Sequence, residues 1–377
     1  MSERIGIAGD WAVVEKVLPP GWREAAVKCG AIIPPAQGKT KSRGKLTEAA
    51  LVLRLVLFHA AAGVSLKVTC AAAAAANLVS VSAVSLHYCM RRCGRYLAFL
   101  LSEMTQTRAL FAAERWAGYE MVVVDATTVL RPGAKGTTAR VHHELRLADL
   151  SLVRILVTDE HGGETLRNFV FTPGQLAIGD RGYANPPGIA AVVDAEADVL
   201  VRYNFGSLPL YDAQAGLLDI ERKLAHLSKP GQVHEWTAYV RPRDHQPIRG
   251  RLIAVRLPPD KAAEARERLR QEQGNDLSER ALRTADFVVL FSTVPRNRLT
   301  AAQLMQLYGL RWQVELRIKR DKSIGELDRL PNLRPDTIYS WICAKLLAQQ
   351  IAHRLSTPDV AFSPSAIAKA ALPALAA

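Results

Sequence analysis

The sequence has few cysteines, and they form no recognisable pair. Five cysteines are scattered along 377 residues, and no two of them make a Cys-x-x-Cys motif. This pattern excludes a dense disulfide framework and a structural zinc site of the Cys-x-x-Cys type. It is typical of a protein that works in a reducing compartment.

Long uninterrupted apolar runs are also missing. The most apolar segment, residues 46–66, contains Glu48, Arg54 and His59, so it is too interrupted to span a membrane. The first residues show no basic stretch followed by an apolar run, which argues against a signal peptide. No Gly-x-x-x-x-Gly-Lys-Ser/Thr loop occurs, so no nucleotide cofactor is expected. Together these absences predict a soluble, cytoplasmic protein.

Positive charge is what the sequence has in excess. The formal net charge is +13 and the isoelectric point is near 9.7. Such an excess favours polyanionic partners, nucleic acid first. The hydrophobic share of 49% is ordinary for a globular protein, and the length allows two or three domains.

The first part of the chain, residues 1–115, is basic and rich in Ala and Leu, which predicts a helical domain that binds DNA. Within residues 65–100, a short break separates two helical segments, and the second is predicted to end in Arg91, Arg92 and Arg95. Two interpretations stay open. The segments form either a helix-turn-helix or two packed helices of a bundle with a basic end.

The rest of the chain mixes strands with helices, which predicts an α/β fold with a mixed sheet. Apolar strands are predicted at four places: 119–130, 137–164 (two strands), 175–180 and 197–205. A mainly β insertion follows, and the chain then turns helical from Thr300. The predicted division is a core, an insertion within it and a tail: 116–204 with 296–355, 205–295, and 356–377.

Three acidic residues stand out by position: Asp125, Asp180 and Glu315. Asp125 and Asp180 each end a predicted apolar strand. Acids at the ends of adjacent strands converge at one edge of a sheet, where the helix-borne Glu315 can join them. Hard divalent cations with oxygen ligands are the usual way to neutralise such a cluster. Taken singly, each acid is more simply a solvated strand end or a surface charge.

Glu315 lies among basic residues in the segment 308–322. On one continuous helix, with about 100° per residue, Tyr308, Arg311, Glu315 and Lys322 fall within roughly 60° of one another. An ordinary solvated face would scatter acids and bases as i,i+4 pairs. One acid among several bases instead suits a metal-binding carboxylate beside phosphate-binding side chains.

The Tyr-x2-Arg-x3-Glu-x6-Lys spacing of residues 308–322 resembles the Tyr-Arg-Glu-Lys box of DDE transposases of bacterial insertion sequences, the insertion-sequence-4 family. Three further segments resemble blocks of the same family, in the same order. They are Val-Asp125-Ala-Thr-Thr with its Pro-Gly turn, Thr-Asp-Glu-His-Gly-Gly-Glu at 158–164, and Gly-Asp180-Arg-Gly-Tyr183.

This resemblance implies a ribonuclease-H-like core, in which Asp125, Asp180 and Glu315 bind two Mg²⁺ ions, with Mn²⁺ as a substitute. It also implies a β-rich insertion between the second Asp and the Glu, which matches the mainly strand-like pattern of residues 205–295. Further residues are expected to contact DNA: Tyr308, Arg311, Lys319, Lys322, Arg140, His142, Arg181, Tyr183 and Phe287.

In relatives, an aromatic residue near the end of the insertion stacks on a flipped base. Phe287 is the best-placed candidate here, with Trp236 and Trp312 as alternatives, although a core Phe is the simpler interpretation.

A second choice concerns His142, His143 and Glu144, which could suggest a metal triad. Adjacent strand residues point to opposite faces, so a packed strand is the simpler account.

The resemblance implies metal-assisted phosphoryl transfer. Water cleaves the DNA at the element's terminal inverted repeats and frees a 3′-hydroxyl, which then attacks target DNA. A homodimer would bring the two ends together, acting at the nucleoid of a bacterial cell. Two alternatives stay open: a catalytically silent DNA-binding relative, and a DDE nuclease without strand transfer.

Overall fold

A computed structural model describes residues 11–34, 45–105, 117–148, 150–273, 278–323, 325–327, 330 and 334–356. Apart from Ser356, the predicted C-terminal tail lies outside these residues. None of the described helices combines the length and the unbroken apolar character that a membrane span requires.

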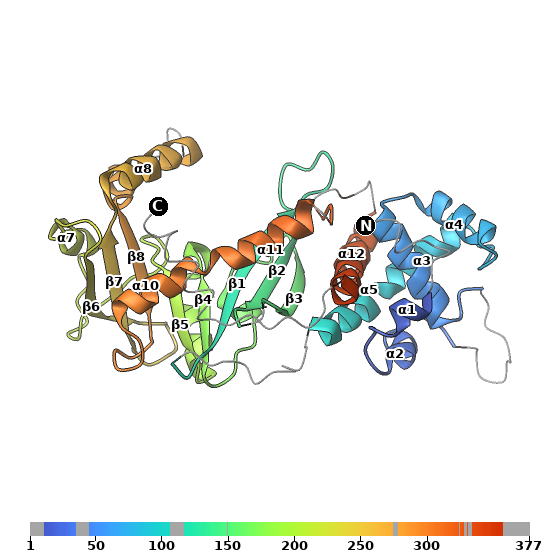
Figure 1. Ribbon diagram of the computed structural model, residues 1–377, viewed down its shortest axis with the longest axis horizontal. Coiled ribbons are helices and arrows are strands. Elements are labelled where there is room, and N and C mark those ends of the chain that lie inside the picture. Colours follow the sequence, from blue (N-terminus) through green and yellow to red (C-terminus); the bar gives the residue numbers. More distant parts are fainter. Residues whose placement is uncertain are drawn as a thin grey trace.

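One sheet of eight strands forms the centre of the molecule, in the order β3-β2-β1-β4-β5-β8-β7-β6 (Figure 1). β1 is parallel to β4 and β4 to β5, whereas the other neighbours are antiparallel. The predicted α/β fold with a mixed sheet is therefore confirmed. The strands are β1 Glu120–Val129, β2 Ala139–Arg146, β3 Leu152–Asp159, β4 Gln175–Gly179, β5 Asp198–Arg202, β6 Val233–Val240, β7 Ile248–Arg256 and β8 Phe287–Ser292.

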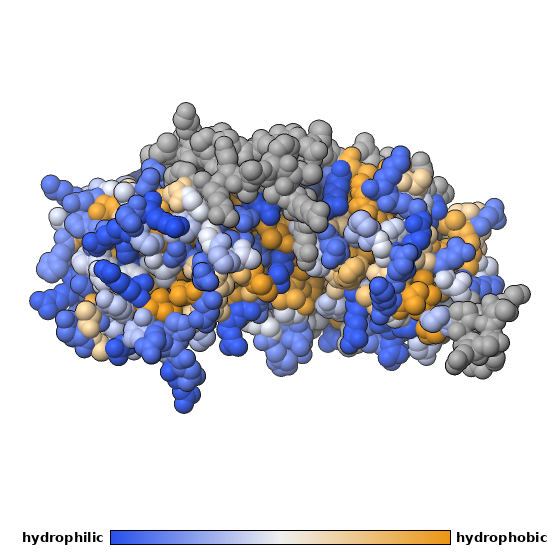
Figure 2. Space-filling model, turned by 90° about the horizontal axis from the view of Figure 1, so that it is seen from below, coloured by the Kyte–Doolittle hydropathy of each residue, from blue (hydrophilic) through white to orange (hydrophobic). Residues whose placement is uncertain are grey.

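β6, β7 and β8 extend the same sheet that holds β1 to β5. β8 lies between β5 and β7, where its apolar sequence Phe-Val-Val-Leu-Phe-Ser is mostly buried. A central strand is covered on both faces, so a nearly continuous apolar run is what this position requires. On the face seen in Figure 2, the end of the molecule that carries β6 and β7 is largely hydrophilic.

The helices pack on both faces of the sheet and beyond its β3 edge. Their bounds are α1 Trp11–Glu15, α2 Trp22–Lys28, α3 Ala49–Ala62, α4 Leu66–Ala75, α5 Ala83–Thr105, α6 Pro186–Asp194, α7 Ile220–Ala225, α8 Pro259–Gln273, α9 Glu279–Thr284, α10 Ala301–Gly309, α11 Trp312–Ser323 and α12 Pro335–Ser356, with short 3₁₀ helices η1 Leu166–Asn168 and η2 Arg181–Tyr183. α11 lies across β1 and β2, on the face where Val123 and Ile178 are buried.

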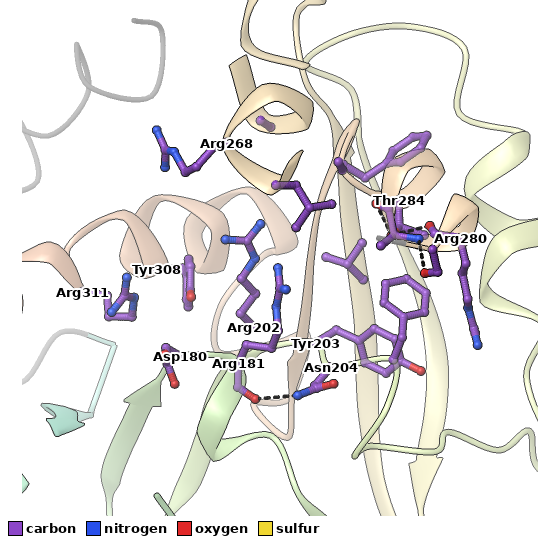
Figure 3. Close-up of a pocket in the computed structure, with 18 residues that line it drawn as sticks. Asp180, Arg181, Arg202, Tyr203, Asn204, Arg268, Arg280, Thr284, Tyr308 and Arg311 are labelled. Atoms are coloured by element: carbon purple, nitrogen blue, oxygen red, sulfur yellow. Dashed lines mark hydrogen bonds between the residues drawn. The ribbon is translucent and has the colours of Figure 1, made fainter. Parts of the chain in front are cut away.

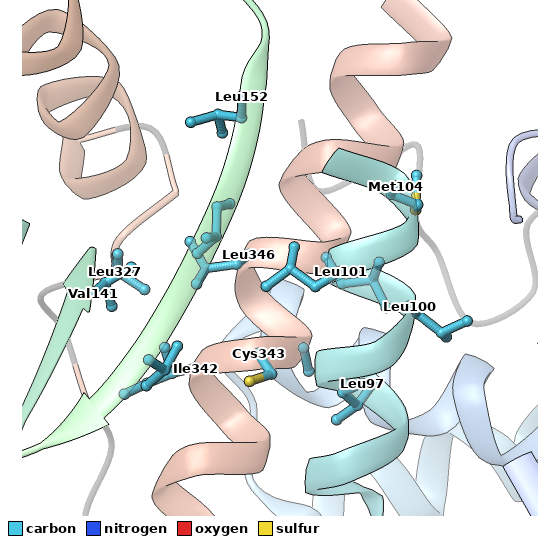
Figure 4. Packing of buried hydrophobic residues seen from close by; sticks show 14 of the residues in the cluster. Leu97, Leu100, Leu101, Met104, Val141, Leu152, Leu327, Ile342, Cys343 and Leu346 are labelled. Atoms are coloured by element: carbon cyan, nitrogen blue, oxygen red, sulfur yellow. The ribbon is translucent and has the colours of Figure 1, made fainter. Parts of the chain in front are cut away.

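α12 joins the helices from the other end of the chain. It packs along α5 and α3 and also contacts β3 (Figure 4). Leu97 and Leu101 of α5 and Ile342 and Leu346 of α12 are buried in this interface. A helical layer is thus assembled from residues that lie far apart in the sequence.

Arg91, Arg92 and Arg95, predicted at the end of the second helix of the basic region, lie in the middle of α5 instead. α5 continues to Thr105, because Leu97, Leu100 and Leu101 extend its buried apolar stripe against α12. Arg91 therefore lies in mid-helix, where it pairs with Asp336 of α12 at 2.7 Å. α5 is a packed helix, and the helix-turn-helix stays a prediction.

β2 carries an acidic side chain in the core. Glu144 is 1% exposed, and neither carboxylate oxygen has a hydrogen-bond partner among the described residues. Arg154 lies 3.7 Å from Oε2. Burial raises the pKa of Glu144 to about 7, against the opposing effect of Arg154. The charged form of this group therefore destabilises the folded state.

We expect Glu144→Gln to favour the folded state more at pH 8 than at pH 5. At pH 5 a carboxyl group with a raised folded-state pKa keeps its proton in the core. At pH 8 it either ionises in the core or stays protonated above its pKa, and both lower the stability of the folded state. The gain in unfolding free energy over wild type should grow by about 2 kcal/mol between these pH values. Urea titrations measure it, with the exposed Glu160→Gln as control. An equal difference at both pH values would contradict the prediction.

Candidate active site

Asp125 lies in the middle of β1, and the prediction that it ends a strand is wrong. β1 runs on to Val129, because Ala126 to Val129 keep pairing with β2. The backbone N–H of Ala126 donates to Asp125 Oδ1 at 2.8 Å. The carboxylate is therefore fixed to its own strand.

Asp180 follows the last residue of β4, as predicted, and caps η2. Its Oδ1 accepts from the backbone N–H of Gly182 at 2.8 Å. Val123 of β1 pairs with Ile178 of the parallel strand β4. Asp125 lies two residues after Val123, and Asp180 two residues after Ile178, so both carboxylates project to the same side of the sheet. This is the side that α11 covers.

The segment 308–322 is not one continuous helix, which corrects the prediction. α10 ends at Gly309 and α11 begins at Trp312. Between them the chain makes tighter bonds, such as Arg311 N–H to the Tyr308 carbonyl at 3.1 Å. The break still leaves Tyr308 and Glu315 next to Arg311.

Arg311 links the helix residues to the sheet. Its Nη2 donates to Glu315 Oε1, and its Nη1 lies 3.7 Å from Asp125 Oδ2. Its guanidinium carbon lies 5.8 Å from the centre of the Tyr308 ring. Four predicted site residues, Asp125, Tyr308, Arg311 and Glu315, thus gather at one place, and Asp180 lies near them (Figure 3).

The acids influence one another electrically. Burial, followed by the charges of Asp180 and Glu315, raises the pKa of Asp125 to about 6, while the Ala126 N–H and Arg311 oppose the shift. Burial and Asp180 also raise the pKa of Glu164. Glu164 was missed as a site residue, although the block at 158–164 contains it.

The donor chemistry of this place suits a hard divalent cation, since Asp125, Asp180 and Glu315 offer only carboxylate oxygens. Within the described ranges, however, no three His, Cys, Asp or Glu side chains are close enough together to hold a metal ion. Arg311 stands between Asp125 and Glu315 and supplies the positive charge.

A cavity of about 500 Å³ opens beside Asp180 and Arg311. Arginines line its walls: Arg181, Arg202, Arg268, Arg280 and Arg311. Figure 3 shows Arg181, Arg202 and Arg311 near Asp180. Arg202 at the end of β5 was missed in the sequence. Its signal was its place at the end of an apolar strand, as with Asp180. The lining suits an anionic ligand.

Among the candidate aromatic residues, only Phe287 lines this cavity in the described part of the chain. Arg256 lies over its ring, with the guanidinium carbon 5.8 Å from the ring centre. Trp236 stacks on His234 of its own strand. Trp312 is 42% exposed at the start of α11.

Lys319 and Lys322 lie further along α11, with Lys322 about 10 Å beyond Glu315 along the helix axis. Arg140 donates to the carbonyl of Gly162 at 2.6 Å and lies 3.9 Å from Glu164.

His142 and Tyr183 are both 0% exposed. His142 bonds with Thr158 at 3.0 Å, and Tyr183 packs on Phe169. The structure therefore places both in the core and not, as predicted, on a DNA-contacting surface.

The neighbouring histidine points the other way. His143 Nε2 lies 2.9 Å from Asp321 Oδ2 of α11, whereas His142 faces Thr158. The two side chains thus lie on opposite faces of β2, as the strand geometry predicts. Asp321 was missed in the sequence, because nothing in the spacing of residues 308–322 singles it out.

Comparison with known proteins agrees with this geometry and defines the class as a DDE-type transposase domain. A family described as "Transposase DDE domain" matches residues 116–351. The transposase for insertion sequence element IS421 of Escherichia coli is 30% identical over 341 residues, which are 87% of this chain and 90% of that protein.

The protein InsL of element IS186A from Escherichia coli K12 is equally similar, at 30% over 340 residues with the same coverage. The transposase for element IS231B of Bacillus thuringiensis is 27% identical over 135 residues, 35% of this chain and 28% of that protein. The chain belongs to the family of DDE transposases of bacterial insertion sequences. Domains of this family generally use divalent metal ions.

Proposed function

We propose that this protein is the transposase of an insertion sequence. It cleaves DNA at the element's terminal inverted repeats and transfers the freed strand into target DNA. One observation carries the proposal: Asp125 and Glu315 meet at Arg311, near Asp180 and beside a cavity lined with arginines. Carboxylates for metal and cations for phosphate are the two parts that phosphoryl transfer on DNA requires.

Asp125, Asp180 and Glu315 would hold the metal, Mg²⁺ or in its place Mn²⁺. When bound, two such ions supply activation of the attacking oxygen and stabilisation of the leaving oxygen. Arg202, Arg311 and Tyr308 would orient the scissile phosphate, and Arg181 would hold the strand beside it. Further along the duplex, Lys319, Lys322 and Arg140 would contact the backbone, and Phe287 would stack on an unpaired base.

The proposal also assigns a role to each part of the chain. Residues 1–115 form the helical domain that binds the element's ends, 116–204 with 296–355 form the ribonuclease-H-like core, and 205–295 form the insertion. Two copies bind the two ends, so that both are cut and joined in one complex. The protein works at the nucleoid in the cytoplasm.

The test uses purified full-length protein, duplex DNA that carries the terminal repeats, a target plasmid, and Mg²⁺ or Mn²⁺. We expect cleavage at the repeat ends with a free 3′-hydroxyl, followed by joined products, and loss of both with a chelator. Binding without cleavage in either metal would show a silent DNA-binding relative. Cleavage without joining would show a nuclease.

A further inference from the structure

A buried polar pair connects α11 to the sheet. His143 on β2 is 0% exposed and Asp321 on α11 is 3% exposed. His143 Nε2 lies 2.9 Å from Asp321 Oδ2, and Arg317 Nε lies 3.2 Å from Oδ1. Both carboxylate oxygens of Asp321 are therefore bonded, which a buried acid requires.

The pair spans the same two elements that carry Asp125 and Glu315. His143 is the residue directly opposite Asp125 in the pairing of β1 with β2. Directly opposite residues of antiparallel strands share a face of the sheet, and their Cβ atoms lie about 5 Å apart. Asp321 follows Glu315 by six residues, about 9 Å along the helix axis. One link to the sheet thus lies within a short distance of both carboxylates.

α11 also makes apolar contacts in this region. Val314 and Ile318 are buried in the apolar cluster on this face. Apolar packing is strong but tolerates small shifts and rotations, whereas a hydrogen bond weakens steeply when its distance or angle changes. The His143–Asp321 bond therefore restricts the position of the helix along β2 more narrowly than the apolar contacts do.

A second connection holds Asp321 from the other side. Its backbone carbonyl accepts from the N–H of Leu327 at 3.2 Å and from Gln349 Nε2 of α12 at 3.5 Å. Asp321 thus joins α11, β2 and α12 at one point.

We propose that His143 and Asp321 are positioning residues of the active site. They fix the helix that carries Glu315 where the carboxylates of Glu315 and Asp125 both lie beside Arg311. This rests on the proposed function to the extent that Asp125 and Glu315 are metal ligands. Neither His143 nor Asp321 touches the reacting atoms.

The test compares full-length Asp321→Ala, Asp321→Asn and Ser323→Ala with wild type. Asn keeps an acceptor for His143, and Ser323 is an exposed residue two positions away on the same helix. Four quantities are measured: hydrogen exchange of residues 312–323, Mn²⁺ affinity by electron paramagnetic resonance, the rate of end cleavage, and the affinity for repeat-end DNA.

For Asp321→Ala we expect about tenfold faster exchange in residues 312–323, at least tenfold weaker Mn²⁺ binding and a parallel loss of cleavage rate. DNA-end affinity should stay within about twofold. Asp321→Asn should recover most of the loss, and Ser323→Ala should match wild type. A folded Asp321→Ala protein with wild-type Mn²⁺ affinity and cleavage would overturn the proposal.

If Asp321→Ala does not fold, His143→Gln takes its place, because its amide still donates to Asp321 but from a shifted position. Wild-type Mn²⁺ affinity in that variant overturns the proposal, and a reduced affinity supports it. If wild-type protein binds no Mn²⁺ or cuts no DNA, the proposed function fails. The exchange rates of residues 312–323 then still decide whether the pair holds α11 in place.

Discussion

Asp125→Asn should lower the rate of end cleavage by at least about 10³-fold, while the affinity for end DNA stays within about twofold. Removing one well-placed charged or polar group from a catalytic site costs about 10²–10³-fold, and a metal ligand is expected at the upper end. The amide has the shape of the carboxylate but lacks its charge, so the proposed metal site loses a ligand while the strand keeps its packing.

The raised pKa of Asp125 predicts that the loss of cleavage in this variant is not caused by unfolding. Because burial raises it to about 6, the ionised group destabilises the fold at pH 8, and Asn removes that penalty. The melting temperature of the variant at pH 8 should therefore not fall. The control is Asp194→Asn, the same change at an exposed residue of α6. Cleavage at the wild-type rate in Asp125→Asn would show that this acid does not act in the reaction.

Arg311→Gln should strengthen Mn²⁺ binding about tenfold and slow end cleavage at least 10²-fold. In the structure Arg311 bonds with Glu315 and lies 3.7 Å from Asp125, so a metal must displace it from both acids. A hydrogen bond to a charged group contributes about 1.5–3 kcal/mol, and about 1.4 kcal/mol corresponds to tenfold in affinity. Cleavage should fall for a separate reason, because in the proposed reaction the displaced guanidinium orients the scissile phosphate.

Mn²⁺ affinity should rise while the cleavage rate falls, and this combination makes the prediction specific. Mn²⁺ affinity is measured by electron paramagnetic resonance without DNA, and cleavage by single-turnover kinetics. Arg320→Gln, an exposed arginine of the same helix, should leave Mn²⁺ affinity unchanged. If Arg311→Gln binds Mn²⁺ as weakly as wild type or more weakly, Arg311 does not compete with the metal.

The motifs predicted that Asp125, Asp180 and Glu315 lie near one another, but not that Glu164 lies near Asp180, nor how the chain brings these acids together. Asp125 and Asp180 share a face because Val123 pairs with Ile178, and this register is a contact between residues 55 positions apart. Nothing local in either strand encodes it. The length of β1 past Asp125 also depends on its partner β2, which continues the pairing.

The interruption between α10 and α11 shows the limit of the helical wheel. The wheel assumes one axis, whereas the chain turns more tightly around Leu310. Gly309 was a local signal, since glycine is unfavourable inside a helix by about 1 kcal/mol. Tyr308, Arg311 and Glu315 still meet, because the tighter turn changes their spacing only slightly.

Burial of individual polar residues was the least predictable feature. His142 and Arg140 are two residues apart on β2, so their side chains point to the same face of the sheet. Only His142 is fully buried. The difference arises from η1 and Phe169, which cover His142 from a segment about 25 residues later. Which elements cover a strand is a property of the whole fold.

The packing of α12 on α5 has a consequence for how the protein is made. The ribosome delivers α5 some 230 residues before the helix that covers it. Until then the stripe of Leu97, Leu100 and Leu101 has no partner in α12. Arg354, at the end of α12, bonds to the carbonyls of Val17 and Met104, so the last turn secures the first helices.

A nascent chain therefore completes its helical layer only when synthesis is nearly finished. Domains made early usually fold as units during translation, and an uncovered apolar helix is a site for chaperones and aggregation. A reading frame cut short before Pro335 would leave that surface bare permanently. Truncated copies of the gene should thus yield insoluble or degraded protein, so they would not compete with the full-length protein for DNA ends.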